Sequence, residues 1–162
     1  MARGREGSGA SPRRRAVKEY ILDANAVLAY LYSKESENSA TLDRLIDLAE
    51  RSEALLSISA INLGEVFYTL RKTLTEESAL RLIGKIAGLA VVVEVNPDTA
   101  IRAAELKYRY KLGYADSFAA LLAIERKATL VSADPDFEKL GKVLRWMKLK
   151  PIGARPSRLA ST

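Results

Sequence analysis

Short apolar runs alternate with longer amphipathic segments along most of the chain. The apolar runs, at residues 20–22, 55–58, 91–95, 129–131 and 143–147, predict buried strands. Apolar residues at helical spacing predict helices over 26–32, 38–51, 60–73, 76–89, 98–111 and 115–127, with a short helical turn from 135. Mostly apolar strands separated by helices are typical of a parallel sheet covered on both faces. The pattern therefore predicts an α/β fold, a three-layer α/β/α domain around a central parallel sheet.

The two ends of the chain lack this periodic pattern. Residues 1–16 contain several glycines and the run Arg13, Arg14 and Arg15, and we interpret them as a flexible basic N-terminal arm. Residues 151–162 are rich in proline, glycine and serine and predict a second loose, basic tail. One folded domain is expected between them, over residues 17–150.

The absence of cysteine and histidine limits the possible chemistry. It excludes disulfides, thiolate nucleophiles and cysteine–histidine zinc sites. It also excludes a Ser-His-Asp triad and any histidine acid–base pair. A bound metal would be held mainly by oxygen atoms, which favours Mg²⁺ or Mn²⁺.

The net charge of +6 is distributed unevenly along the chain. Residues 1–19 carry +4 and residues 142–162 carry +6, whereas residues 20–141 carry −4. An acidic body with basic ends is consistent with a nucleic-acid ligand and a cation-binding site, although basic ends can also simply aid solubility. No apolar run approaches the roughly eighteen residues of a membrane span, and no signal peptide is recognisable, so we expect a cytoplasmic protein without membrane contact.

Four acidic residues follow or adjoin the predicted strands. Asp23 directly follows the first strand, Glu65 lies on the helix after the second, and Asp134 follows the fourth. Asp116 opens a helix that is otherwise apolar. Each of the three aspartates could be a helix cap, but several carboxylates beside apolar segments, with no basic partner nearby in sequence, would repel one another. A divalent cation between them would remove both the burial cost and the repulsion, so the four acids are the candidate metal ligands.

Four segments resemble the successive motifs of PIN-domain nucleases, and most closely those of VapC-type toxins. They are residues 20–25 (YILDAN), 59–66 (SAINLGEV), 114–120 (YADSFAA) and 130–137 (LVSADPDF), in family order over residues 18–147. The resemblance implies a five-stranded parallel sheet and one or two Mg²⁺ or Mn²⁺ ions. It makes Asp23, Glu65 and Asp116 the principal acids and Asp134 the fourth, with Asp136 as the alternative fourth acid. It also implies supporting roles for Asn25 and for Ser132, where the family more often has threonine.

The function that this resemblance implies is metal-dependent hydrolysis of RNA. Water activated by the metal would attack the phosphodiester bond and leave 3′-hydroxyl and 5′-phosphate ends. VapC-type toxins are usually homodimers silenced by a VapB-type antitoxin, so both partners are expected here. Two alternatives stay open: a PIN-domain nuclease of RNA processing or decay that is not a toxin, and a non-catalytic RNA- or protein-binding module whose acids bind no metal.

Two basic segments are weaker candidates for RNA binding. Tyr108 and Arg109 lie in a run of alternating cations and aromatics at 107–111, which could stack and clamp single-stranded RNA. The same run is equally typical of a helix that ends in a basic turn, favourable to the helix dipole. The arginines at 13–15 could contact phosphates or remain solvated.

Overall fold

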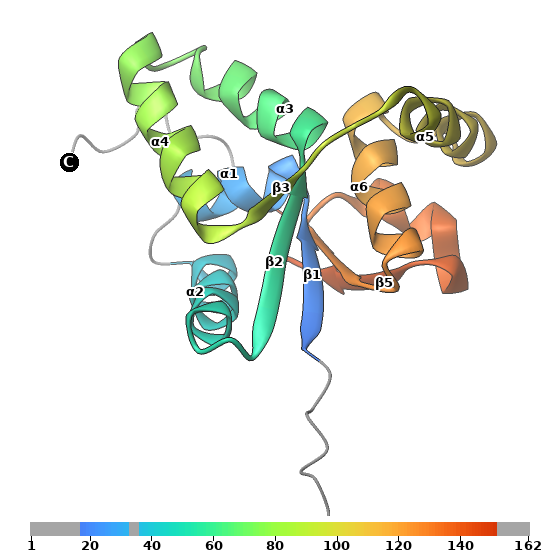
Figure 1. Cartoon of the computed structure of the whole chain (residues 1–162), viewed down its shortest axis with the longest axis horizontal. Coiled ribbons are helices and arrows are strands. Elements are labelled where there is room, and N and C mark those ends of the chain that lie inside the picture. The colour runs from blue at the N-terminus through green and yellow to red at the C-terminus, as the bar shows by residue number, and fades with distance from the viewer. Residues whose placement is uncertain (1–16, 33–35, 152–162) are drawn as a thin grey trace, which may run out of the picture.

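A parallel sheet of five strands forms the centre of the computed structural model, which describes residues 17–32 and 36–151. The strands are β1 (Lys18–Leu22), β2 (Ala54–Ser59), β3 (Val91–Val93), β4 (Thr129–Ser132) and β5 (Arg145–Lys148). Their order across the sheet is β3-β2-β1-β4-β5, and all four pairings are parallel. The predicted α/β fold with a central parallel sheet is confirmed (Figure 1).

Helices connect the strands in the expected order. They are α1 (Ala24–Tyr32), α2 (Glu37–Glu50), α3 (Ala60–Leu70), α4 (Glu76–Leu89), α5 (Pro97–Tyr110), α6 (Tyr114–Glu125) and the 3-10 segment η1 (Pro135–Val143). Side-chain caps fix several helix starts: Ser59 accepts a hydrogen bond from the backbone N–H of Asn62, and Asn96 accepts one from Thr99. Among the described helices, none is both long and apolar enough to cross a membrane.

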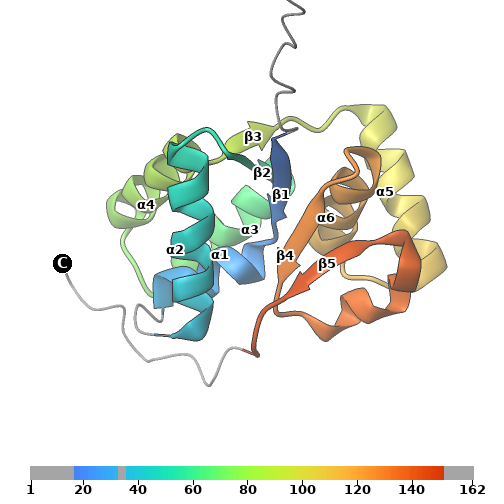
Figure 2. The same ribbon diagram turned by 90° about the horizontal axis from the view of Figure 1, so that it is seen from below.

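The helices cover both faces of the sheet and create two main apolar cores. In Figures 1 and 2, α1, α2 and α4 lie on one side of the sheet, and α5 and α6 lie on the other. One core is formed by buried side chains of the four helices α1, α2, α3 and α4, which pack against Leu56, Ile58 and Val131 of the sheet. The other joins α6 and η1 with Ile21 and Leu130. Neighbouring residues of β1 and β4 thus enter opposite cores, as the pleat of a doubly covered sheet requires.

Several boundaries differ from the predictions by two or three residues. β1 and α1 each begin two residues earlier than predicted, α3 ends three residues earlier and α6 ends two residues earlier. β3 ends at Val93, because only its three residues pair with β2, and the predicted residues 94 and 95 lie beyond the pairing. β5 begins at Arg145 rather than 143, since Gly141 adopts φ +51° inside the preceding 3-10 segment and delays the strand. The predicted basic arm and most of the predicted tail lie outside the described residues.

Candidate functional site at the carboxyl ends of the strands

The carboxyl ends of β1, β2 and β4 lie together at one edge of the sheet. Asp23 follows β1, α3 with Glu65 starts directly after β2, and Asp134 follows β4. Because the strands are parallel, segments that are distant in sequence meet there, which is where open α/β sheets place their ligands. The first turn of α6 brings Asp116 to the same region, and α3 and α6 are in contact. The four predicted acids therefore converge.

Asp23 is the most buried of these acids, with 1% of its surface exposed. The Ser132 hydroxyl donates to its Oδ2 at 2.7 Å, and the Asn62 amide donates to its Oδ1 at 3.2 Å. Burial raises the pKa of Asp23 to about 7; the Ser132 hydrogen bond opposes this rise, and the charges of Asp116 and Glu65 add to it. Both oxygens of Asp23 are thus held in place, at an electrostatic cost to the ionised form.

Asp116 bends back onto the start of its own helix. It is the third residue of α6, whose N-cap is Gly113, and its carboxylate accepts a hydrogen bond from the Gly113 backbone. A Cβ atom at position 113 would lie 2.1 Å from Asp116 Oδ2, so only glycine leaves room for the carboxylate. Burial raises the pKa of Asp116 to about 6, with further contributions from Asp134, Glu65 and Asp136.

Glu65 reaches the same group of acids from α3. Its side chain is accessible to solvent, yet partial desolvation raises its pKa, and the charge of Asp134 adds to this rise. The positive charge of Lys72 lowers the pKa of Glu65 and so partly offsets this rise. The sequence showed no basic residue close to Asp23 or Asp116, and Lys72 is the cation that the fold places near Glu65.

The two acids after β4 have different surroundings. Asp134 caps η1, since its Oδ1 accepts from the backbone N–H of Asp136 at 2.8 Å, while its own N–H donates to Ser132 Oγ at 3.0 Å. Asp134 raises the pKa of both Glu65 and Asp116. Asp136 raises the pKa of Asp116 but not that of Glu65, and it forms an ion pair with Lys139 at 2.8 Å. Asp134 is therefore better placed than Asp136 to share a ligand with the other acids, and its capping role is real as well.

Oxygen ligands of this kind suit Mg²⁺ or Mn²⁺. Burial is the main cause of the raised pKa values of three acids, and the charges of neighbouring carboxylates add to it; a nearby cation would offset both effects. Asn25 Oδ1 is a buried polar atom without a hydrogen-bond partner in the described part of the chain, two residues after Asp23. Among the described residues, no three acids already stand in the arrangement of a metal site. The donor set nevertheless fits a divalent ion in its chemistry, because every candidate ligand is an oxygen atom.

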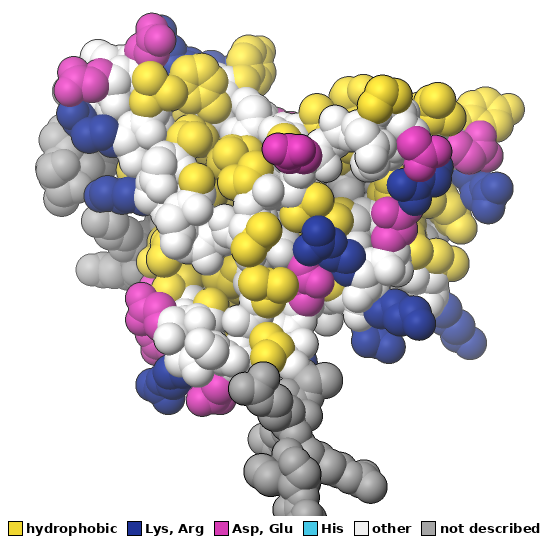
Figure 3. Space-filling model, viewed as in Figure 1, with side chains coloured by type: hydrophobic (Ala, Val, Ile, Leu, Met, Phe, Trp, Pro, Cys, Tyr) yellow, Lys and Arg dark blue, Asp and Glu magenta, His cyan; other side chains and the backbone are white. Residues whose placement is uncertain are grey.

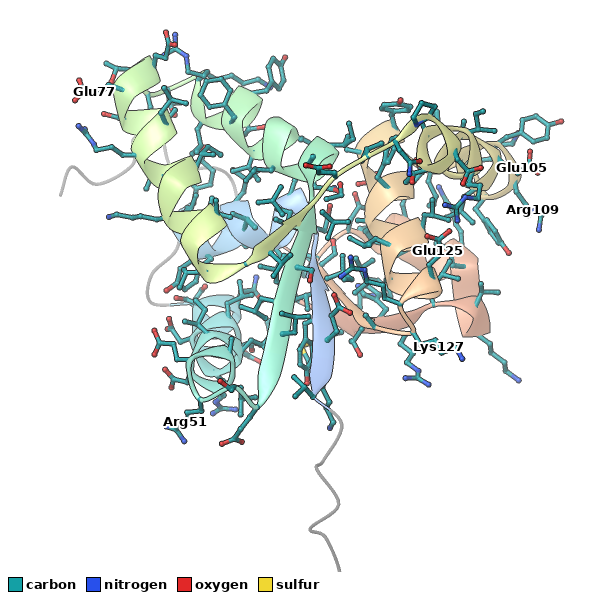
Figure 4. All side chains as sticks on the ribbon, in the orientation of Figure 1. Arg51, Glu77, Glu105, Arg109, Glu125 and Lys127 are labelled. Atoms are coloured by element: carbon teal, nitrogen blue, oxygen red, sulfur yellow. The ribbon has the colours of Figure 1, made fainter. Side chains whose placement is uncertain are left out.

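The candidate RNA-binding residues on α5 are not part of this group. Tyr108 is 73% exposed, with Lys111 Nζ 4.6 Å from its ring centre. Arg109 pairs with Glu105 on the same helix, and Figure 4 shows both at the outer end of α5, away from α3. The arginines at 13–15 lie outside the described residues.

Asn62 is a site residue that sequence reasoning missed. It is fully buried and contacts Asp23 directly. Its only sequence signal is a polar side chain in an otherwise apolar turn of helix, three residues before Glu65. Such a position is easily attributed to helix capping, because Ser59 does cap this helix through the Asn62 backbone.

Comparison with known proteins identifies the family of this chain. Residues 20–143, most of the chain, match the PIN domain family. The chain belongs to the PIN domain family. Comparison with curated protein sequences gives no significant match.

Several solved structures share this PIN-domain fold. One is VapBC2 from Rickettsia felis bound to a DNA fragment from its promoter, with a TM-score of 0.65 and 19% sequence identity. The match covers 82% of the present chain and 99% of the VapBC2 chain. DNA-bound VapBC from Salmonella typhimurium has a TM-score of 0.64 at 20% identity, with 81% and 98% covered. VapC20 from Mycobacterium tuberculosis, described as a toxin that cleaves the sarcin–ricin loop, has a TM-score of 0.62 at 16% identity, with 82% and 99% covered. The PIN domain of this chain thus has the fold of VapC toxins over nearly the full length of those proteins.

Proposed function

We propose that this PIN-domain protein is a metal-dependent endoribonuclease and the toxin of a VapBC-type pair. The observation that supports it most is the meeting of Asp23, Glu65 and Asp116 at one sheet edge, with raised pKa values caused by burial and mutual repulsion. Buried carboxylates that repel one another cost free energy unless a cation compensates them, so this arrangement supports a cation-binding site. Membership of the PIN domain family and the fold of VapC toxins agree with this function.

Side chains of the chain itself would hold the ion. Asp23, Asp116, Glu65 and Asp134 would supply the oxygen ligands, with Ser132 orienting Asp23 and Asn25 adding a further oxygen. A bound Mg²⁺ or Mn²⁺ would supply Lewis-acid chemistry, lowering the pKa of water and neutralising charge on the phosphoryl oxygens. As the resemblance to PIN-domain nucleases implies, water rather than the ribose 2′-hydroxyl would attack, and the products would carry 5′-phosphate and 3′-hydroxyl ends.

Cleavage of a labelled RNA in Mn²⁺ tests the nuclease. The wild-type protein should cut, EDTA should stop cutting, and Asp116→Asn should abolish it while the melting temperature is retained. Asp98→Asn is the matched control, because Asp98 is an exposed acid on α5 that pairs with Arg102 on its own helix. Undiminished cleavage by Asp116→Asn would refute the proposal.

The toxin role and its partners need separate tests. The two VapBC structures described above support a VapB-type antitoxin as a partner. An apolar groove of about 210 Å³ between α1, α2 and α4, lined by residues such as Tyr30, Ile46 and Leu82, offers surface for a partner protein. Expression of the wild-type chain should arrest growth, and the product of a neighbouring gene should relieve the arrest. Nuclease activity without growth arrest would instead identify an RNA-processing enzyme.

A homodimer is the assembly that we propose for the free protein. Light scattering should then give twice the chain mass of 17.8 kDa. A single-chain mass at micromolar concentration would contradict the dimer without affecting the nuclease proposal.

A further inference from the structure

Asn62 connects the three elements that carry the principal acids. It lies in the first turn of α3, three residues before Glu65, and none of its surface is exposed. Its Nδ2 donates to Asp23 Oδ1 at 3.2 Å and to the carbonyl oxygen of Ala115 at 3.2 Å. Ala115 directly precedes Asp116 in α6. A single amide group therefore spans the residue after β1, the start of α3 and the start of α6.

The orientation of this amide is fixed by its surroundings. Its Oδ1 accepts a hydrogen bond from the Ser59 hydroxyl at 2.5 Å, and that hydroxyl in turn accepts from the Asn62 backbone N–H at 3.1 Å. A reversed amide would point its oxygen at the Ala115 carbonyl, which can only accept, and would lose the hydrogen bond that this carbonyl receives. Both amide protons and the amide oxygen are therefore used, and no other common side chain of this size provides two donors and one acceptor in this geometry.

The hydrogen bonds of Asn62 fix the position of α3 along α6, which apolar packing alone does not determine. Packing of α3 against α6 is provided by Ile61, Phe118 and Leu121. Such contacts fix the separation of the helices better than their shift along one another, because apolar packing is not directional. Hydrogen bonds are directional, so the bonds from Asn62 to Asp23 and Ala115 define that shift.

We propose that Asn62 is a positioning residue, which holds Asp23 and the first turn of α6 in register with Glu65 at the carboxyl ends of the strands. This inference rests on the proposed metal-dependent function. Asn62 itself needs no contact with the ion or the RNA. Its removal should weaken ion binding more than any general loss of stability would explain.

Asn38 provides a matched control within the same chain. It is also a buried asparagine, and its side chain joins two distant segments by donating to the Lys150 carbonyl at 2.8 Å and accepting from the Lys150 N–H at 2.9 Å. This pair ties the start of α2 to the residues after β5. Asn38→Ala therefore removes a comparable pair of buried hydrogen bonds, away from the acids.

The experiment measures Mn²⁺ affinity, by the EPR signal of free Mn²⁺, together with the melting temperature in EDTA. Asn62→Ala should weaken Mn²⁺ binding about ten- to a hundredfold, the usual effect of losing a group that orients metal ligands. Asn38→Ala should leave the affinity within about twofold at a similar loss of melting temperature. Hydrogen exchange in the first turn of α6 should accelerate in Asn62→Ala alone, which is a readout independent of the metal.

The outcomes separate this inference from the proposed function. Wild-type affinity in a folded Asn62→Ala, or equal weakening in Asn38→Ala, would overturn the positioning role and leave the nuclease proposal intact. Absence of Mn²⁺ binding by the wild-type protein would overturn both. If Asn62→Ala does not fold, Asn62→Ser replaces it, because a serine hydroxyl can donate to only one of the two acceptors and should show an intermediate loss of affinity.

Discussion

Substitution of Asp23 by asparagine should stabilise the metal-free protein at alkaline pH. The pKa of Asp23 is about 7 in the folded chain, above its ordinary value of 3.8, chiefly because the carboxylate is buried. The folded state binds this proton more tightly than the unfolded state, so stability falls as pH rises from about 4 to about 7 and stays low above that. Asparagine resembles the protonated acid in shape and carries no charge, so it avoids this loss.

The pKa difference sets the size of the effect. A rise of this size costs about 4 kcal/mol of unfolding free energy at pH 8, at roughly 1.4 kcal/mol per pKa unit. Near pH 5 the cost falls to less than half of this value, because the native carboxyl group is then mostly protonated. For a domain of this size, the pH 8 difference corresponds to a melting temperature higher by about 10 °C.

Urea unfolding in EDTA at pH 5 and pH 8 provides the assay. Asp23→Asn should be more stable than the wild type at pH 8 and only slightly so at pH 5, whereas Asp47→Asn, an exposed change on α2, should match the wild type at both. Added Mn²⁺ should reverse the order at pH 8 by stabilising only the wild type. An Asp23→Asn protein that is no more stable at pH 8 than the wild type would refute this account of the buried carboxylate.

Three further predictions concern the site, the core and the N-terminal arm. Gly113→Ala should displace the Asp116 carboxylate, because the added Cβ would meet Oδ2 at 2.1 Å; we expect Mn²⁺ affinity to fall about tenfold with a melting temperature near that of the wild type, and unchanged affinity would contradict this. Leu70→Ala should lower the unfolding free energy by about 3 kcal/mol in urea, since Leu70 is fully buried in the larger core, and a loss below about 1 kcal/mol would contradict such burial. Deletion of residues 1–16 should flatten the salt dependence of RNA affinity if the arm contacts phosphates, whereas an unchanged slope would leave the arm without that role.

Most of the fold could be predicted from the sequence because its signals are local and strong. The apolar runs around Ile21, Leu56 and Leu130 lie in buried strands, and residues 76–89 form a helix with the predicted limits. Two of the strand boundaries that differed depend on long-range pairing. β3 and β5 are edge strands whose lengths are set by one neighbour each, which sequence periodicity does not report.

The acids were recognisable because they follow strand ends, and parallel strands bring those ends together. Their supports were less visible. Asn62 bonds to residues that are 39 and 53 positions away in sequence, and Gly113 is required by a carboxylate three residues later that folds back onto it. Sequence spacing shows neither contact, because both depend on how α3 and α6 settle on the sheet.

The surface around the site explains why RNA-binding residues stayed uncertain. Figure 3 shows hydrophobic side chains spread over α3 and β3, while basic side chains gather toward the lower right, below α6, where Figure 4 places Lys127. Lys127 lies at the opposite end of α6 from Asp116. Local charge in the sequence therefore does not identify the surface on which RNA would lie.

Anomalous diffraction from crystals soaked in Mn²⁺ tests the metal centre most directly. The account predicts a strong peak within bonding distance of carboxylate oxygens from Asp23 and Asp116, with Glu65 or Asp134 nearby, and no such peak in Asp116→Asn crystals soaked in the same way. A wild-type map without a peak at the carboxyl ends of β1, β2 and β4, at Mn²⁺ concentrations that support RNA cleavage, would contradict it.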